Sequence, residues 1–174
     1  MSLLFSRVLL SGLLLGALSC SAEPGIDLSD GSTVPASTWQ DRWLVINYWA
    51  EWCGPCRHEI PELNVLNASG EAHDLVVLGV NYDGLLGAKL REVVVRMGIE
   101  FPVLTEDPRS LYGYDEQPVL PATVLIDPAR RVRSVLVGPQ TAQSIREAIM
   151  SSVPEGAGVE LEAAVEPATG SGTP

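Results

Sequence analysis

The pair Cys53 and Cys56 is the feature that most constrains how this chain folds. It directly follows an apolar, β-rich run at residues 44–49, and a stretch of helical character follows it. Two intervening residues at a helix start let the sulfur atoms approach disulfide distance with little backbone strain. There, unpaired N–H groups and the helix dipole would stabilise a Cys53 thiolate, the nucleophilic form of cysteine. The context predicts a redox-active disulfide in which the more buried Cys56 resolves mixed disulfides by attacking Cys53.

Other uses of a CxxC pair fit this chain less well. A zinc site needs about four ligands, so the pair would need partners such as His58 and His73, and there is no second CxxC. Covalent haem attachment requires a histidine directly after the second cysteine, where this chain has Arg57. An inert structural disulfide is the remaining alternative, although so short a loop adds little stability by chain entropy. We therefore expect no metal, and no cofactor besides the disulfide itself.

The hydrophobic pattern alternates between strands and helices. The runs at residues 44–49 and 75–82 are mostly uninterrupted, as buried central strands would be. Such alternation favours an α/β layer structure that ends in an antiparallel strand pair and a final helix. The other expected elements are a hairpin at 26–35, a helix from the CxxC to about 67, a helix at 86–97, a short extended piece at 101–104, helical turns at 109–114, strands at 122–126 and 132–137, and a helix at 141–151 capped by Thr141.

The N-terminal segment has the features of a secretory signal. Within residues 1–19, Arg7 is the only charged side chain, and the apolar run at 8–18 is shorter than the roughly 20 residues of a membrane-spanning helix. The run ends in ALSC, which resembles a bacterial lipobox whose cysteine, here Cys20, is lipidated. The alternative is cleavage after Ala22, which would release a soluble periplasmic protein. We expect a lipoprotein anchored to the membrane on the periplasmic side.

Composition limits the domain organisation and the partners. The 174 residues leave room for one domain with extensions, and 11 basic against 22 acidic residues give a net charge of −11. This balance lacks the basic footprint that nucleic-acid binding requires. Large apolar residues become scarce after residue 153, which predicts a disordered acidic tail. The expected division is a signal at 1–19, a tether at 20–24, a folded domain at 25–153 and the tail at 154–174.

The residues around the CxxC resemble the thioredoxin superfamily. Residues 46–56 read INYWAEWCGPC, and the wider pattern is most similar to the membrane-tethered TlpA/ResA/CcmG branch of extracytoplasmic thiol–disulfide oxidoreductases. The similarity covers about residues 25–151. It implies a thioredoxin-like fold, in which helices flank a central mixed β-sheet, with an N-terminal hairpin and an inserted strand–helix unit around 75–104.

The resemblance also assigns a substrate-binding surface beside the disulfide. It makes Pro121 a cis-proline facing the cysteines and leaves the backbone of Leu120 free to pair with a substrate strand. Trp52 would be an exposed apolar platform next to the nucleophile. The residues between the cysteines, Gly54 and Pro55, complete this expected surface.

The proton partner of Cys56 is expected to differ from that of thioredoxins. Thioredoxins carry a buried aspartate where this chain has Asn47, which cannot titrate, so another group must exchange the proton. The resemblance implicates Glu59, which shares a helix face with Cys56 at a spacing of three residues. The alternative is an ordinary solvated glutamate.

The resemblance implies a reductase of disulfides in extracytoplasmic proteins, with electrons supplied by a membrane thiol donor. Apocytochrome c maturation is one task of this kind. A disulfide oxidase or isomerase is the alternative within enzymes, although Gly-Pro between the cysteines accompanies reducing thioredoxins. A metal-binding or chaperone module is the alternative from another class, although copper-delivering relatives have a wider cysteine spacing and a later histidine.

Overall fold

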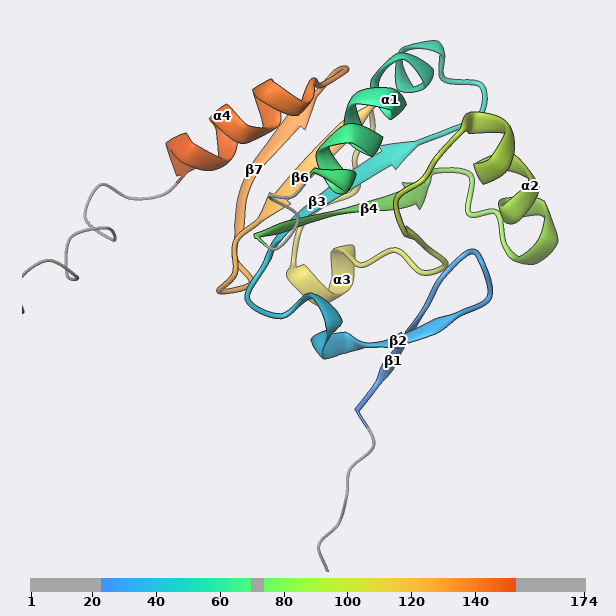
Figure 1. Ribbon diagram of the computed structural model, residues 1–174, viewed down its shortest axis with the longest axis horizontal. Coiled ribbons are helices and arrows are strands. Elements are labelled where there is room, and N and C mark those ends of the chain that lie inside the picture. The colour runs from blue at the N-terminus through green and yellow to red at the C-terminus, as the bar shows by residue number, and fades with distance from the viewer. Residues whose placement is uncertain (1–22, 70–73, 153–174) are drawn as a thin grey trace, which may run out of the picture.

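The computed structural model describes residues 23–69 and 74–152 (Figure 1). The expected signal at 1–19, Cys20 and the expected tail at 154–174 lie outside the described residues, as does the tether apart from Glu23 and Pro24. Within the described ranges, none of the helices is both long and apolar enough to span a membrane.

A mixed five-stranded sheet forms the centre of the molecule, in the order β5-β4-β3-β6-β7. β4 (Leu75–Asn81) pairs in parallel with β3 (Trp43–Trp49) and with β5 (Val103–Leu104). β6 (Ala122–Ile126) pairs antiparallel with β3, and β7 (Val132–Val137) pairs antiparallel with β6. The two long apolar runs form β3 and β4. Both strands are buried on both faces of the sheet, so they need apolar side chains on each face. The predicted mixed sheet is confirmed.

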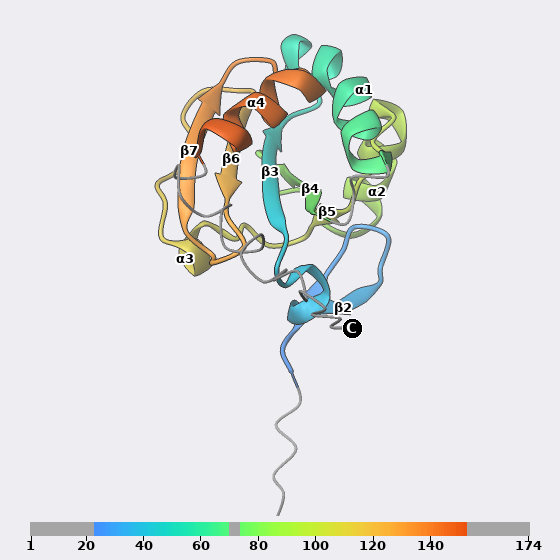
Figure 2. The ribbon, with the colours of Figure 1, turned by 60° about the vertical axis from the view of Figure 1, so that its left-hand side comes forward.

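Helices cover one face of this sheet, as Figure 2 shows. These are α1 (Gly54–Ala68), α2 (Gly87–Met97) and α4 (Ala142–Ser152). Their buried residues pack with Val45, Trp49 and Val77 of the sheet into the larger of two hydrophobic clusters. The expected cap of α4 is confirmed, because Thr141 Oγ1 accepts a hydrogen bond of 3.0 Å from the N–H of Ser144.

The opposite face is covered by smaller elements. These are the hairpin of β1 (Gly25–Asp27) and β2 (Thr33–Pro35), the 3₁₀ helix η1 (Ala36–Trp39) and the short helix α3 (Arg109–Tyr112). They pack against Leu44, Ile46 and Tyr48, which alternate with the residues of the first face. The hairpin also bonds to the edge strand β5, where the Ser29 N–H donates to the Val103 carbonyl at 2.8 Å. The edge is thereby shielded from pairing with another chain.

Candidate active site

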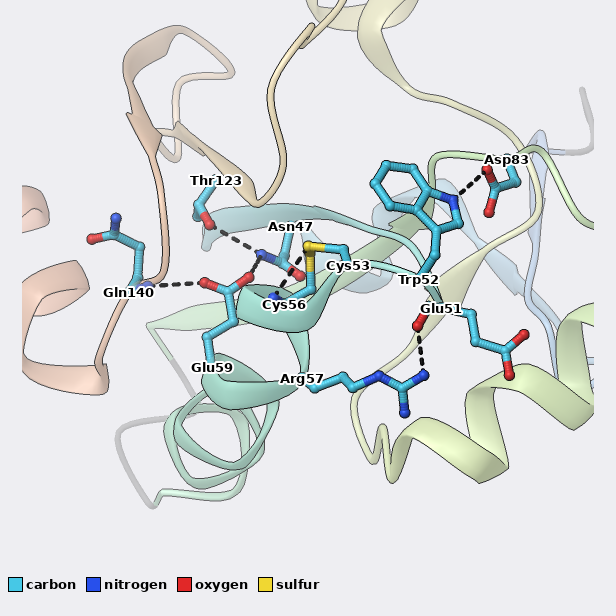
Figure 3. Close-up of a disulfide and its surroundings, with 10 residues drawn as sticks. All are labelled: Asn47, Glu51, Trp52, Cys53, Cys56, Arg57, Glu59, Asp83, Thr123 and Gln140. Atoms are coloured by element: carbon cyan, nitrogen blue, oxygen red, sulfur yellow. Dashed lines mark hydrogen bonds between the residues drawn. A yellow bond between two sulfur atoms is a disulfide. The ribbon is translucent and has the colours of Figure 1, made fainter.

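The two cysteines form a disulfide where the central strand passes into the first long helix (Figure 3). The S–S distance is 2.02 Å, and the two Cα atoms are 5.3 Å apart. β3 ends at Trp49, and Cys53 is the N-cap of α1, in extended conformation. The Cys56 N–H donates to Cys53 Sγ at 3.2 Å. An N–H group of the first helical turn is therefore directed at the sulfur on which a thiolate would form.

The cysteines differ in burial as the sequence predicts. Cys56 is fully buried, whereas Cys53 retains 4% of its accessible surface. Gly54 and Pro55 are exposed between them. An incoming disulfide would therefore approach from the side of Cys53, and Cys56 is placed to act from within the protein.

Glu59 lies one helical turn beyond Cys56 and is almost completely buried, with 1% exposure. Its carboxylate accepts hydrogen bonds from Asn47 Nδ2 at 2.8 Å and from the Gln140 N–H at 2.9 Å. Burial raises the pKa of Glu59 to about 6, against the lowering effect of both hydrogen bonds. The alternative of a solvated helix glutamate is therefore wrong.

Asn47 connects this carboxylate to the sheet. It is fully buried in β3, and its Nδ2 also donates to Thr123 Oγ1 at 3.2 Å. Thr123 stands directly opposite Asn47 in the antiparallel β3–β6 pair. Sequence reasoning missed both Thr123 and Gln140. A polar residue inside the apolar strand β6 was the available signal for Thr123, whereas Gln140 contributes its backbone, which no side-chain pattern reveals.

An aromatic surface lies on the other side of the disulfide from Glu59 (Figure 3). Trp52 is 66% exposed, as expected for a platform, and its Nε1–H donates to Asp83 Oδ1 at 3.1 Å. Its ring meets that of Tyr82 edge to face, with the centroids 6.3 Å apart. The sequence did not identify Tyr82 or Asp83, which follow β4. The indole is thus held in one orientation while its apolar surface stays open.

The expected cis peptide bond is present between Leu120 and Pro121. The residue that follows, Ala122, pairs with Tyr48 near the carboxyl end of β3. This register places Leu120 and Pro121 at the same end of the sheet as the CxxC. Pro121 is buried and Leu120 half-buried.

Metal ligands do not gather in the part of the chain that the structure describes. Across residues 23–69 and 74–152, no group of three or more His, Cys, Asp or Glu side chains is placed to hold an ion. His58 is exposed on α1, and His73 lies outside the described residues.

Comparisons with known proteins agree with this geometry. The model of the AhpC/TSA family matches residues 21–135. The thiol–disulfide oxidoreductase ResA of Geobacillus thermodenitrificans is 28% identical over 137 residues, which are 77% of this chain and 78% of the relative. The thiol:disulfide interchange protein HelX of Rhodobacter capsulatus is 31% identical over 106 residues, 60% of this chain and 57% of HelX. The crystal structure of a thiol:disulfide interchange protein of the thioredoxin family from Chlorobium tepidum is also similar, with a TM-score of 0.61 and 23% identity. The match covers 75% of this chain and 94% of that protein.

Proposed function

The chain belongs to the thioredoxin-like AhpC/TSA family and is a thiol–disulfide oxidoreductase, and from this premise we propose that it reduces disulfides in extracytoplasmic proteins. The observation that carries the proposal is the Cys53–Cys56 disulfide at the start of α1. In the reduced protein the same N–H group that now bonds to Cys53 Sγ would stabilise a Cys53 thiolate. The disulfide is the only redox group that the reaction requires.

The reaction begins with attack of the Cys53 thiolate on a substrate disulfide. The substrate S–S bond breaks, a mixed disulfide with Cys53 forms, and the first substrate thiolate leaves and takes a proton from solvent. Cys56 then loses its proton to the Glu59 carboxylate and attacks Cys53 Sγ. The Cys53–Cys56 bond forms, and the second substrate thiolate leaves and is protonated. Two electrons have passed from the protein dithiol to the substrate.

The environment of Glu59 suits it to accept this proton. A pKa of about 6 leaves the carboxylate mostly ionised at neutral pH, yet makes it a stronger base than an exposed glutamate. Cys56 and Glu59 are separated by three residues on one helix face, at which side chains are neighbours. The exchange takes place directly or through one water.

The substrate-binding surface comprises Trp52, Gly54, Pro55 and the Leu120–Pro121 pair. An apolar indole supplies contact area beside the nucleophile, and the exposed backbone of the CxxC turn lets an extended chain approach. Substrates are protein thiols and disulfides. Apocytochrome c is the substrate class that the resemblance suggests, because its haem-binding cysteines must be reduced before haem is attached.

The proposed location is the periplasmic side of a bacterial membrane, with a tether through lipidated Cys20. The support is the signal-like segment at 1–19 and the lipobox-like ALSC sequence. A membrane thiol donor would return the disulfide to the dithiol, as a reductase in an oxidising compartment requires. Mass spectrometry of the mature N-terminus tests the tether. A diacylglyceryl-modified Cys20 supports it, and an unmodified N-terminus at Glu23 would favour the soluble periplasmic form.

The reducing direction is tested by the potential of the Cys53/Cys56 couple and by trapping. We expect a reduction potential similar to that of thioredoxin, which is about −270 mV. A potential of about −120 mV would favour an oxidase. Cys56→Ala should accumulate dithiothreitol-sensitive mixed disulfides with periplasmic proteins, and the Cys53→Ala/Cys56→Ala double variant should accumulate none. Stoichiometric metal on the wild type without trapped partners would favour the metal-binding alternative.

A further inference from the structure

Among the residues that the structure describes, the Asn47 amide forms hydrogen bonds through its nitrogen only. Its nitrogen has two partners, Glu59 and Thr123, at 2.8 and 3.2 Å. Its oxygen is buried and has no hydrogen-bond partner within the described residues. Buried amide oxygens nearly always accept a hydrogen bond, so an unpaired acceptor beside the redox site requires a physical explanation.

The disulfide offers such an explanation. Figure 3 shows the amide with its nitrogen turned to Glu59 and its oxygen turned to the side on which the two sulfur atoms lie. Glu59 contacts Asn47 directly, and Cys56 is the neighbour of Glu59 one turn earlier on α1. In the oxidised protein neither sulfur carries a hydrogen. Reduction adds two electrons and breaks the S–S bond, and Cys56 then takes up a proton and becomes an S–H donor.

In the described part of the chain, the groups that donate hydrogen bonds to the Glu59 carboxylate are neutral. Asn47 approaches from β3 and the Gln140 N–H from the segment before α4, and no charged side chain is among the causes of its raised pKa. The next acid along α1, Glu62, instead accepts a hydrogen bond from the Ala142 N–H at 3.2 Å. In the disulfide form Cys56 does not titrate. After reduction, its thiol is the group beside Glu59 that can exchange a proton with the carboxylate.

We propose that Asn47 is a positioning residue for the resolving step, in which its Nδ2 holds the Glu59 carboxylate and its Oδ1 accepts the Cys56 S–H of the reduced protein. The inference rests on the proposed function and deepens it. One rigid amide thus aligns the proton and its acceptor. When Cys53 enters a mixed disulfide, the Cys56 proton passes to Glu59, the Cys56 thiolate forms the new S–S bond, and Oδ1 is again without a donor.

A purely structural role of Asn47 would be to join β3 to β6 through Thr123. Loss of the amide would then lower stability without changing proton transfer. Asn67 is a matched control, because its side chain likewise bonds to a strand but lies at the end of α1 away from the cysteines. Its Oδ1 accepts a hydrogen bond from the Val77 N–H of β4 at 3.1 Å.

The experiment uses the reduced protein and the aromatic disulfide DTNB. Attack by Cys53 releases one thionitrobenzoate, and resolution by Cys56 releases the second. In Asn47→Leu the second release at pH 7 should slow about tenfold or more, with its pH midpoint moved up, while the first stays within about twofold of wild type. Asn67→Ala should leave both phases unchanged. If Asn47→Leu does not fold, Asn47→Ser carries the same expectation.

A second readout does not depend on turnover. Carbon-13 NMR of the Glu59 carboxyl should give a higher pKa in the Asn47 variant than in wild type, because one hydrogen bond to the ionised form is lost. Unchanged release rates and an unchanged Glu59 titration would overturn the role of Asn47. A wild-type protein that never releases the second thionitrobenzoate would instead refute the proposed function.

Discussion

The side chain of Asn47 donates a hydrogen bond of 2.8 Å to Glu59, and this bond joins the centre of the sheet to the helical turn that follows the CxxC. Thioredoxins place a titrating aspartate in the strand. Here the strand supplies a neutral amide, and the acid is on α1, beside Cys56. The proposed proton acceptor and the proposed resolving cysteine therefore lie on the same helix.

Removing the Glu59 carboxylate should change how the rate of resolution by Cys56 depends on pH. Glu59→Gln keeps the shape of the side chain but cannot accept a proton, so resolution at pH 7 should slow about 100-fold or more. The dependence on a group with a pKa of about 6 should disappear. Stopped-flow measurement of the second thionitrobenzoate release from pH 5 to 8 checks this.

Glu62→Gln is the matched control for this variant. Glu62 lies three residues further along α1, and its carboxylate accepts from the Ala142 N–H. Glu62→Gln should lower the free energy of unfolding but leave the pH dependence of the second thionitrobenzoate release unchanged. A profile of Glu59→Gln that coincides with that of Glu62→Gln would remove Glu59 from the mechanism.

Glu59 should also affect folding stability, in a direction set by its raised pKa. The folded protein holds the proton more tightly than the unfolded chain, whose Glu pKa is near 4.5. Its stabilising contribution is therefore complete below about pH 4.5 and is lost as the pH rises through about 6. The upward shift corresponds to about 2 kcal/mol.

Urea denaturation of the oxidised wild type and Glu59→Gln at pH 4 and pH 7.5 measures this term. The free energy of unfolding of the wild type relative to the variant should fall by about 2 kcal/mol between the two pH values. A relative stability of wild type that rises with pH would contradict the raised pKa.

Trp52 should matter for protein substrates and not for small disulfides. Trp52→Ala removes the exposed indole, so kcat/KM with insulin disulfides should fall about tenfold, while first-phase reaction with DTNB changes little. Val95→Ala, which truncates a 78% exposed side chain on α2, should leave both rates unchanged. Equal losses of Trp52→Ala with both substrates would point to damage at the disulfide instead of lost docking.

Gly79 is required for packing beneath the site. A Cβ at this position of β4 would stand 3.0 Å from Trp49 Nε1, Phe101 Cε2 and Val103 Cγ2. Gly79→Ala should therefore lower the free energy of unfolding by about 1–3 kcal/mol, because the close-packed neighbours must shift. Gly54 has no atom within 4 Å of such a Cβ, and Gly54→Ala should not destabilise the protein. Thermal or urea unfolding of both variants provides the comparison.

Local patterns predicted most of the architecture. The strands β3 and β4, the helix that starts at the CxxC and the pair β6–β7 follow from runs of apolar residues and from helix and turn signals within a few positions of each other. The close pairing of Cys53 and Cys56 follows in the same way from a separation of three residues. The inward position of Cys56 likewise needs only its place one turn into the helix.

The burial and partners of Glu59 could not be predicted from these patterns. Along the chain, Gln140 lies 81 residues from Glu59, and Thr123 lies 76 residues from Asn47. Trp52 and Asp83 are separated by 31 residues. No periodicity extends over such distances, so the contacts exist only once the sheet and helices have packed.

The sequence by itself determined that this chain has a strand–CxxC–helix unit with a reactive cysteine pair, because the interactions that define the unit are local. Only the tertiary structure decided that Glu59 is a buried acid and that the buried amide oxygen of Asn47 has no hydrogen-bond partner in the part of the chain that the structure describes. The physical reason is that desolvation and hydrogen bonding depend on every segment packed around a group, and here those segments come from β3, β6 and the approach to α4.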